Sequence, residues 1–251
     1  MLKINFNNDP EVFEIGVDEA GRGPMFGRVY ASAVLLPKDN RFRHDLMKDS
    51  KRFTSDKKIK QVASYIKENA IAWGIGYATE ECIDKINIRQ ATFIAMHNAI
   101  RDILIKLKNR IDKEGEVLEE LEIPALLEVS SVEEESLDKI DISKIEILID
   151  GNDFKPYTVI DSSSNLVQIP HVCIEGGDNK YTNIAAASIL AKVARDEYIA
   201  DICKSVPTLD ERYGILKNKG YGTKKHMDGI ERYGITKYHR KTFGKCRMYT
   251  N

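Results

Sequence analysis

The order of short apolar segments and longer helical patterns most strongly constrains how this chain folds. Segments typical of β-strands lie at residues 14–18, 29–36, 70–76, 145–150 and 171–175, and helical patterns lie at 54–66, 88–108 and 182–202. Strands that follow one another early in a chain favour antiparallel pairing, whereas helices between later strands favour parallel crossovers. The sequence therefore predicts an α/β fold with a mixed sheet flanked by helices. We expect Thr54 to cap the first helix, and the alanine-rich body of the last helix to pack closely on the sheet.

The composition excludes several classes of protein. Hydrophobic residues make up 42% of the 251 residues, charged residues make up 31%, and the net charge is −1, which is unlike a disordered chain. No apolar run approaches the roughly 20 residues of a membrane helix, and the first residues lack a secretion-signal pattern. The four cysteines form no CxxC pair, which argues against structural zinc and suits reduced thiols. We expect a cytoplasmic protein with no membrane partner.

The charges are strongly segregated along the chain. Residues 110–146 hold 13 acidic and 4 basic side chains, whereas residues 204–247 hold 12 Lys or Arg and 4 Asp or Glu. We expect residues 1–203 to form one domain with an acidic insertion at about 110–146, and residues 204–251 to form a basic helical extension. A charge run alone is commonly a solvated helix face. Tyrosines interleave with these basic residues, however, and this favours a nucleic-acid partner.

Acidic residues stand where three segments of the expected sheet end or turn. Asp18 and Glu19 end the first strand, Asp150 ends the fourth, and Asp178 precedes the last helix. Ligands of open α/β sheets gather beyond the carboxyl ends of strands, so Asp18 and Asp150 converge there if their strands are parallel neighbours. Taken singly, each residue could serve only a turn or a helix start. Together they indicate a site for Mg²⁺ or Mn²⁺, which prefer oxygen ligands, and for phosphodiester chemistry with two ions.

Several motifs resemble those of one known family, type 2 ribonuclease H or ribonuclease HII. The first is Gly16-Val-Asp-Glu-Ala-Gly-Arg-Gly-Pro24. The others, in the family's order and spacing, are Asp49-Ser-Lys51, Leu148-Ile-Asp-Gly151, the helix segment Ala185–Asp196, Lys219-Gly-Tyr-Gly-Thr223 and His239-Arg-Lys-Thr-Phe243. The resemblance covers nearly the whole chain apart from the acidic insertion.

The resemblance implies a fold, an activity and a set of metal ligands. The fold is a ribonuclease H-like mixed five-stranded sheet flanked by helices, with a C-terminal helical extension. The activity is hydrolysis of the RNA strand of RNA–DNA hybrids and incision 5′ of single ribonucleotides in duplex DNA, leaving 3′-hydroxyl and 5′-phosphate ends. The implied roles are DNA replication and ribonucleotide excision repair. The catalytic carboxylates that bind two Mg²⁺ or Mn²⁺ ions match Asp18, Glu19, Asp150 and Asp178.

The resemblance also implies substrate-binding residues. Gly21, Arg22 and Gly23 match a loop that reads the ribose 2′-hydroxyl largely through the main chain, and glycine allows the sugar to approach closely. Tyr221 matches a tyrosine that stacks on the next deoxyribose. Lys51 and Lys192 match phosphate contacts, although both could be ordinary solvated lysines, whereas Arg195 and Asp196 suggest a structural ion pair or a helix-end contact.

One segment departs from the family's pattern, and three alternative functions stay open. The segment Met25-Phe-Gly-Arg28 differs from the family's usual run and places an extra cation near the site. A ribonuclease HIII-like enzyme is one alternative, although few residues precede Asp18 to form the further N-terminal domain of that type. A binding module with a degenerate site is another, although all four carboxylates are present. A nucleotide-binding enzyme fits poorly, because Gly74-Ile-Gly76 is not a full GxGxxG motif. We expect a monomer.

Overall fold

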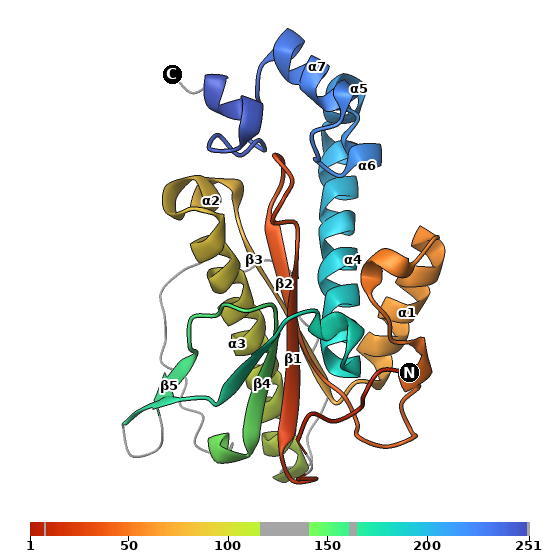
Figure 1. Cartoon of the computed structure of the whole chain (residues 1–251), viewed down its shortest axis with the longest axis vertical. Helices are drawn as coiled ribbons and strands as arrows, with labels where there is room; N and C mark the ends of the chain where they lie inside the picture. Colours follow the sequence, from red (N-terminus) through yellow and green to blue (C-terminus); the bar gives the residue numbers. More distant parts are fainter. Residues whose placement is uncertain (8, 116–140, 161–164, 250–251) are drawn as a thin grey trace.

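The computed structural model describes residues 1–7, 9–115, 141–160 and 165–249, and its centre is a mixed five-stranded sheet (Figure 1). The strands are β1 (Phe13–Ala20), β2 (Val29–Leu35), β3 (Ala72–Ala78), β4 (Ile145–Asp150) and β7 (His171–Ile174), in the spatial order β3-β2-β1-β4-β7. The pairs β1–β2 and β2–β3 are antiparallel, whereas β1–β4 and β4–β7 are parallel. The expected mixed sheet is thus confirmed.

Helices cover both faces of this sheet. The long helix α3 (Ile88–Gly115) packs on one face, and α4 (Thr182–Ser205) with α1 (Asp56–Asn69) packs on the other (Figure 1). Central strand β1 has helices on both faces, and its residues Glu14–Asp18 are all buried. A Cβ atom on Gly16 would lie 2.3 Å from the carbonyl carbon of Asn183, which shows how closely α4 approaches β1. The small residues predicted to allow this packing, Ala185–Ala187, are fully buried.

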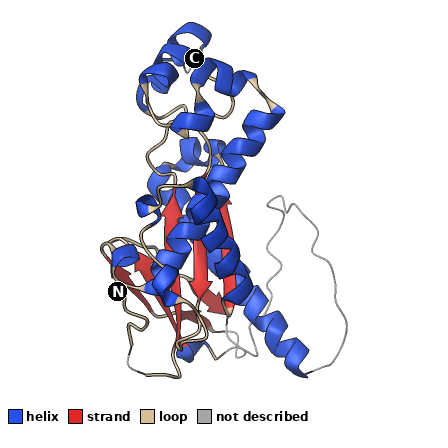
Figure 2. Ribbon diagram, turned by 90° about the vertical axis from the view of Figure 1, so that its right-hand side faces the viewer, coloured by secondary structure: helices blue, strands red, loops and turns tan. Residues whose placement is uncertain are grey.

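The C-terminal extension forms a cap of short helices beyond the end of the sheet (Figure 2). It contains α5 (Thr208–Tyr213), α6 (Ile215–Asn218), α7 (Lys224–Tyr233) and a final 3₁₀ segment at Gly244–Tyr249. Its apolar core includes Leu209 and Tyr213, and it also takes in Phe26 from the loop after β1 and Ile199 from α4. The extension therefore packs directly on the segment that follows the first strand. The proposed division at residue 203 stays a prediction.

Several local features differ from the expectations. Helix α2 (Glu80–Ile86) and the hairpin β5 (Thr158–Ile160) with β6 (Leu166–Gln168) were not predicted, because each is too short for periodicity to show. The signal for α2 is its cap, since the Thr79 hydroxyl accepts a hydrogen bond from the N–H of Cys82 at 3.2 Å. Helix α1 begins after Ser55, so the predicted cap Thr54 is wrong. Most of the acidic insertion lies outside the described residues.

Two further observations bear on the expected class. All four cysteines are unpaired, as expected for reduced thiols. No helix among the described residues is long and apolar enough to span a bilayer.

Candidate active site

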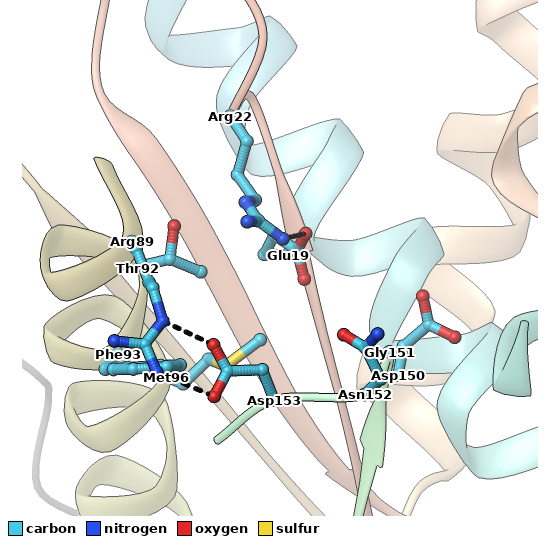
Figure 3. Close-up of a pocket in the computed structure, with 10 residues that line it drawn as sticks. All are labelled: Glu19, Arg22, Arg89, Thr92, Phe93, Met96, Asp150, Gly151, Asn152 and Asp153. Atoms are coloured by element: carbon cyan, nitrogen blue, oxygen red, sulfur yellow. Dashed lines mark hydrogen bonds and ion pairs between the residues drawn. The ribbon is translucent and has the colours of Figure 1, made fainter. Parts of the chain in front are cut away.

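The carboxyl ends of β1 and β4 bring the first acidic residues together. In the parallel ladder Val17 lies opposite Ile149, and each is followed directly by an aspartate, Asp18 or Asp150. Asp18 is only 5% exposed, and its Oδ1 accepts a hydrogen bond from the N–H of Glu19 at 2.6 Å. Figure 3 shows Glu19 on β1 facing the segment that begins at Asp150. The predicted convergence of the two strand ends is therefore present in the fold.

Asp178 reaches the same edge from the loop between β7 and α4. One oxygen of Asp150, Oδ1, accepts hydrogen bonds from the N–H groups of Gly177 at 2.6 Å and Asp178 at 3.4 Å. Gly176 makes this turn possible with a left-handed φ of +61°. Asp178 is itself buried, and its carboxylate accepts a hydrogen bond from the side chain of Asn179 at 3.0 Å. The structure thus gathers all four predicted carboxylates at one end of the sheet.

The carboxylates are electrostatically strained without a cation. Burial raises the pKa of Asp18 well above its usual range, and the charges of Glu19 and Asp150 raise it further. Burial also raises the pKa of Glu19, although neighbouring Arg22 opposes this shift. For Asp178, burial and then the charge of Asp150 raise the pKa. Three acids that resist ionisation at one edge form a site that a positive charge would stabilise.

The donor set fits divalent ions that prefer oxygen. The four side chains supply only carboxylate oxygens, which are the ligands that Mg²⁺ and Mn²⁺ take in proteins. Within the described residues, however, no three acidic, histidine or cysteine side chains stand close enough to form a finished coordination shell. An ion bound here would need the carboxylates to come closer together, and relief of their mutual repulsion would favour this.

A pocket beside these carboxylates contains residues that the sequence did not single out. Its lining includes Glu19 and Asp150, and Arg89 from α3 forms a two-pronged ion pair there with Asp153, at 2.5 and 2.9 Å (Figure 3). Arg22 lies across the pocket, and its Nη1 is 3.4 Å from Oε1 of Glu19. The sequence offers one signal for Asp153, because this residue lies only three positions after the end of β4. Nothing in the sequence pairs it with Arg89, 64 positions earlier.

The glycine loop after β1 is held by a buried arginine. Arg240 is fully buried, and its guanidinium donates hydrogen bonds to the carbonyls of Gly21 at 2.6 Å, Arg22 at 3.0 Å, Pro24 at 2.8 Å and Gly27 at 2.8 Å. In a trans peptide the N–H points opposite to the C=O, and no peptide bond described here is cis. The N–H groups of Arg22 and Gly23 therefore point away from Arg240. These two main-chain donors therefore face outward from the buried guanidinium.

Close packing explains why Gly21 is a glycine. Its φ is +96°, and a Cβ atom there would lie 2.2 Å from Nε of Arg195. Arg195 is buried and donates to the carbonyls of Phe26 at 3.2 Å and Lys219 at 2.8 Å. Asp196 forms its ion pair with Lys192, at 2.8 Å, and not with its neighbour Arg195. Neighbours on a helix point in different directions, whereas residues four apart share a face.

Tyr221 lies across from the glycine loop. Its ring is half exposed, and its Cε1 is 3.4 Å from the position that a Cβ on Gly23 would take. The N–H of Met25 donates to the carbonyl of Gly220 at 3.0 Å, which joins the two segments. The fold thus brings the predicted loop and tyrosine together, although nearly two hundred residues separate them in the sequence.

The two predicted lysines differ in their surroundings. Lys51 lies in a 3₁₀ turn (Ser50–Arg52), and the hydroxyl of Ser50 is 3.0 Å from that of Ser188 on α4. The charge of Lys51 lowers the pKa of Asp178, so Lys51 stands near the carboxylates. Lys192 instead lies on α4 and is occupied by its ion pair with Asp196. The geometry therefore favours Lys51 over Lys192 as a phosphate contact.

The extra cation at Arg28 is stacked between aromatic rings. Its guanidinium carbon lies 4.3 Å from the ring centre of Tyr77 and 4.7 Å from that of Tyr198. The hydroxyl of Tyr198 in turn donates to Glu80 at 2.5 Å. Arg28 thus has a structural environment of its own, between β2, β3 and α4.

Sequence comparisons identify one family, and comparisons with solved structures identify one fold. A sequence model of the family described as Ribonuclease HII matches residues 15–122 and 119–247. The ribonuclease HII of Parabacteroides distasonis is 39% identical over 230 residues, which cover 92% of this chain and 89% of that protein. The crystal structure of ribonuclease H2 from Pyrococcus horikoshii OT3 superposes with a TM-score of 0.56 at 20% identity, covering 94% of this chain and 96% of the other. Bst-RNase HIII in complex with Mn²⁺ gives a TM-score of 0.57 at 18% identity, covering 94% and 68%.

Proposed function

Because this chain belongs to the ribonuclease HII family, we propose that it cleaves the RNA strand of RNA–DNA hybrids and also incises duplex DNA 5′ of a single ribonucleotide. One observation carries the proposal. The loop Gly21–Gly23, with its outward N–H groups, begins three residues after Asp18. A sugar read by this loop therefore has its phosphate close to the carboxylates.

Asp18, Glu19, Asp150 and Asp178 are the residues that would hold two divalent ions, Mg²⁺ or Mn²⁺. Bound ions of this kind supply a more acidic water and stabilise charge on the departing oxygen. The protein's part is to gather the carboxylates on β1, β4 and the loop before α4. Support comes from the raised pKa values of Asp18, Glu19 and Asp178, whose charged forms lack a nearby counter-charge of sufficient strength. Cleavage at the 3′-oxygen then leaves 3′-hydroxyl and 5′-phosphate ends.

Selection of a ribose uses the loop and Tyr221. The 2′-hydroxyl distinguishes RNA from DNA, and main-chain N–H groups can donate to it. Arg240 supports this role because it engages the loop carbonyls and so turns the N–H groups of Arg22 and Gly23 outward. The half-exposed ring of Tyr221 offers a flat apolar surface for the neighbouring sugar. Lys51 is the proposed phosphate contact, which its effect on the pKa of Asp178 supports.

The duplex path follows the basic C-terminal extension. Residues 204–247 carry 12 Lys or Arg against 4 acidic residues, and Tyr221 lies within this segment. Phosphate contacts there give affinity without sequence preference. Participation in replication and ribonucleotide excision repair, a cytoplasmic location and a monomeric state remain predictions.

The test is incision of a labelled DNA duplex that carries one ribonucleotide, with Mg²⁺ present and an all-DNA duplex as control. We expect one cut on the 5′ side of the ribonucleotide and none in the control. Cleavage of a long hybrid but not of this duplex would contradict the ribonucleotide-incision part and indicate selectivity of the ribonuclease HIII type. No cleavage of either substrate with Mg²⁺ or Mn²⁺ would indicate a binding module.

Gly23→Ala tests the loop without disturbing the fold. Gly23 has no left-handed φ, and the nearest atom to an added methyl is Cε1 of Tyr221 at 3.4 Å, an ordinary contact. We expect normal thermal stability and weaker cleavage of the single-ribonucleotide duplex, since the methyl group stands where the sugar approaches. Unchanged cleavage by this variant would remove the loop from the ribose-reading role.

A further inference from the structure

Two histidines lie buried behind Tyr221, and none of the roles proposed above uses them. His226 on α7 is 0% exposed, and His239, in the segment after α7, is 1% exposed. Their Nε2 atoms are 3.1 Å apart, and Nδ1 of His226 lies 2.9 Å from the carbonyl oxygen of Tyr221. The pair therefore ends on the backbone of the proposed sugar-contacting residue.

One neighbour of the histidine pair, a backbone N–H group, can only donate. It therefore determines the direction of every hydrogen bond that the two rings make. The backbone N–H of Thr236 donates to Nδ1 of His239 at 2.9 Å, so this nitrogen carries no proton. A neutral His239 then holds its proton on Nε2 and donates it to Nε2 of His226. His226 consequently holds its proton on Nδ1 and donates to the carbonyl of Tyr221. A single directed chain runs from Thr236 through both imidazoles to Tyr221.

Burial keeps this chain in its neutral form. It lowers the pKa of His226, and burial together with repulsion from His226 lowers the pKa of His239 to about 3. A neutral imidazole accepts at one nitrogen and donates at the other, whereas the cation can only donate. At neutral pH the two rings therefore donate in the same direction across the core of the extension, from His239 to His226 and from His226 to Tyr221.

Tyr221 depends on its backbone for its orientation. Its carbonyl also accepts from the N–H of Thr223 at 2.8 Å, and its own N–H donates to the carbonyl of Asn218 at 2.9 Å. The two preceding residues, Lys219 and Gly220, turn sharply with φ values of +51° and +84°. Tyr221 is 52% exposed, so packing alone constrains its ring little. The hydrogen bond from His226 thus acts on the part of Tyr221 that determines where the ring stands.

The same segment also reaches the glycine loop. Arg240 follows His239 and donates to the carbonyls of Gly21 and Arg22. The ring of Phe26 packs edge-on against His239 with centroids 5.0 Å apart. His239 therefore reaches Tyr221 through His226, and the adjacent Arg240 contacts the Gly21–Gly23 loop directly. Together they contact both parts of the proposed ribose-reading element.

We propose that His239 and His226 are positioning residues that hold Tyr221 against the Gly21–Gly23 loop and thereby set how efficiently a ribonucleotide junction is cut. This inference rests on the proposed function, because it assumes that Tyr221 contacts the sugar.

The first test compares His226→Phe with a matched control, Tyr213→Phe. The phenylalanine at 226 keeps a ring and removes both nitrogens. The control removes a hydrogen bond from the same core, since the Tyr213 hydroxyl donates to the carbonyl of Gly234 at 3.0 Å, without a link to Tyr221. On the single-ribonucleotide duplex we expect kcat/KM to fall about tenfold for His226→Phe and to stay within about twofold for Tyr213→Phe. Equal losses would overturn the proposal.

The second test places the same substitution in a Tyr221→Ala background. If the histidines act through Tyr221, His226→Phe then changes kcat/KM by less than about twofold, because the two losses are not additive. A merely structural role would lower kcat/KM by the same factor in both backgrounds, and this result would overturn the proposal. So would wild-type cleavage by Tyr221→Ala alone.

Two amide variants decide the matter if the phenylalanine variant does not fold. His226→Asn places an N–H group near the position of Nδ1, whereas His226→Gln places its amide near Nε2. We expect Asn to retain most of the activity and Gln to lose it, and equal activities would overturn the proposal. Failure of the wild-type protein to cut the duplex is a different result, since it overturns the proposed function itself and this inference with it.

Discussion

Asp150 combines two tasks in one side chain. Its Oδ1 accepts hydrogen bonds from the N–H groups of Gly177 and Asp178, which attaches the loop before α4 to the end of β4. Its charge acts on Asp18, Glu19 and Asp178, and raises the pKa of each. Substitution by asparagine separates the two tasks, because an amide oxygen can still accept the hydrogen bonds but the charge is gone.

We therefore predict that Asp150→Asn folds and binds an RNA–DNA hybrid but cleaves it more than about a hundredfold more slowly. Loss of a group that only supports a metal ligand already costs ~10–100-fold, and a ligand itself should cost more. Single-turnover cleavage and hybrid binding measured side by side test this. A variant that cuts at the wild-type rate with Mg²⁺ would falsify the assignment of Asp150.

A second prediction concerns Asp18 in the metal-free protein. Its pKa is raised in the folded state, so folding favours the protonated form and the ionised form destabilises the fold. This destabilisation is fully present above the raised pKa and disappears as the pH falls through it toward the ordinary value. At pH 7 without metal we expect Asp18→Asn to melt about 2–4 °C higher than the wild type, the shift expected for ~1 kcal/mol in a domain of this size.

The pH dependence and the metal ion provide the controls. The difference in melting temperature between Asp18→Asn and the wild type should shrink as the pH is lowered. Added Mg²⁺ should raise the melting temperature of the wild type more than that of the variant, because ligands stabilise the state that binds them. A variant less stable than the metal-free wild type at pH 7 would show that Asp18 has a different structural role.

At the scale of elements, two glycines of β3 determine how closely α3 covers the sheet. Cβ atoms on Gly74 and Gly76 would lie 2.3 Å from the carbonyl oxygen of Ala99 and 2.2 Å from that of Ala95. Both obstacles are backbone atoms of α3, which cannot rotate away. The incomplete glycine motif noted in the sequence thus serves helix–strand packing. This packing matters for the site because Arg89 and Met96 of α3 line its pocket.

We predict that Gly76→Ala lowers the free energy of unfolding by about 1–3 kcal/mol, the usual cost of overpacking a core. Denaturant unfolding measures this loss. Gly23→Ala is the matched control, since the same methyl group meets only an ordinary contact there and should leave the stability unchanged. Equal stability of the two variants would show that α3 moves away from β3 without cost.

At the scale of the whole molecule, the distribution of charge distinguishes two ends. The exposed side chains of Lys217 and Lys224 lie in the basic extension, close to Tyr221 in sequence. Lys144 is also exposed but precedes β4, so it stands about 20 Å from Asp150 at the usual rise of a strand. If the duplex lies along the extension, Lys217 and Lys224 contact phosphates and Lys144 does not.

We predict that Lys217→Ala and Lys224→Ala each reduce the salt dependence of duplex binding, with the slope of log K against log salt falling by about 1 per lost contact. Lys144→Ala should leave the slope unchanged. Binding isotherms at several salt concentrations provide the measurement. An equal change for all three variants would place the duplex elsewhere on the surface.

The sequence was sufficient for much of the fold and for the family. The strand Ile145–Asp150 was predicted with the bounds it has, because a run of β-branched and apolar residues encodes a buried strand locally. The ribonuclease HII resemblance, confirmed by the comparisons, rests on motifs that are themselves continuous in sequence. Short elements such as α2 were not predicted, because a helix of two turns contains too few residues for a periodic pattern.

The strands of the central sheet, the three long helices and the carboxylates at the strand ends could all be read from the sequence. Three contacts became visible in the folded chain alone. Arg240 holds the carbonyl of Gly21, 219 positions away, Arg89 pairs with Asp153, and His239 reaches Tyr221 through His226. The reason is physical. Backbone propensity and side-chain periodicity act over a few neighbouring residues, whereas the partner of a buried polar group is chosen by which distant segment the folded chain brings within about 3 Å.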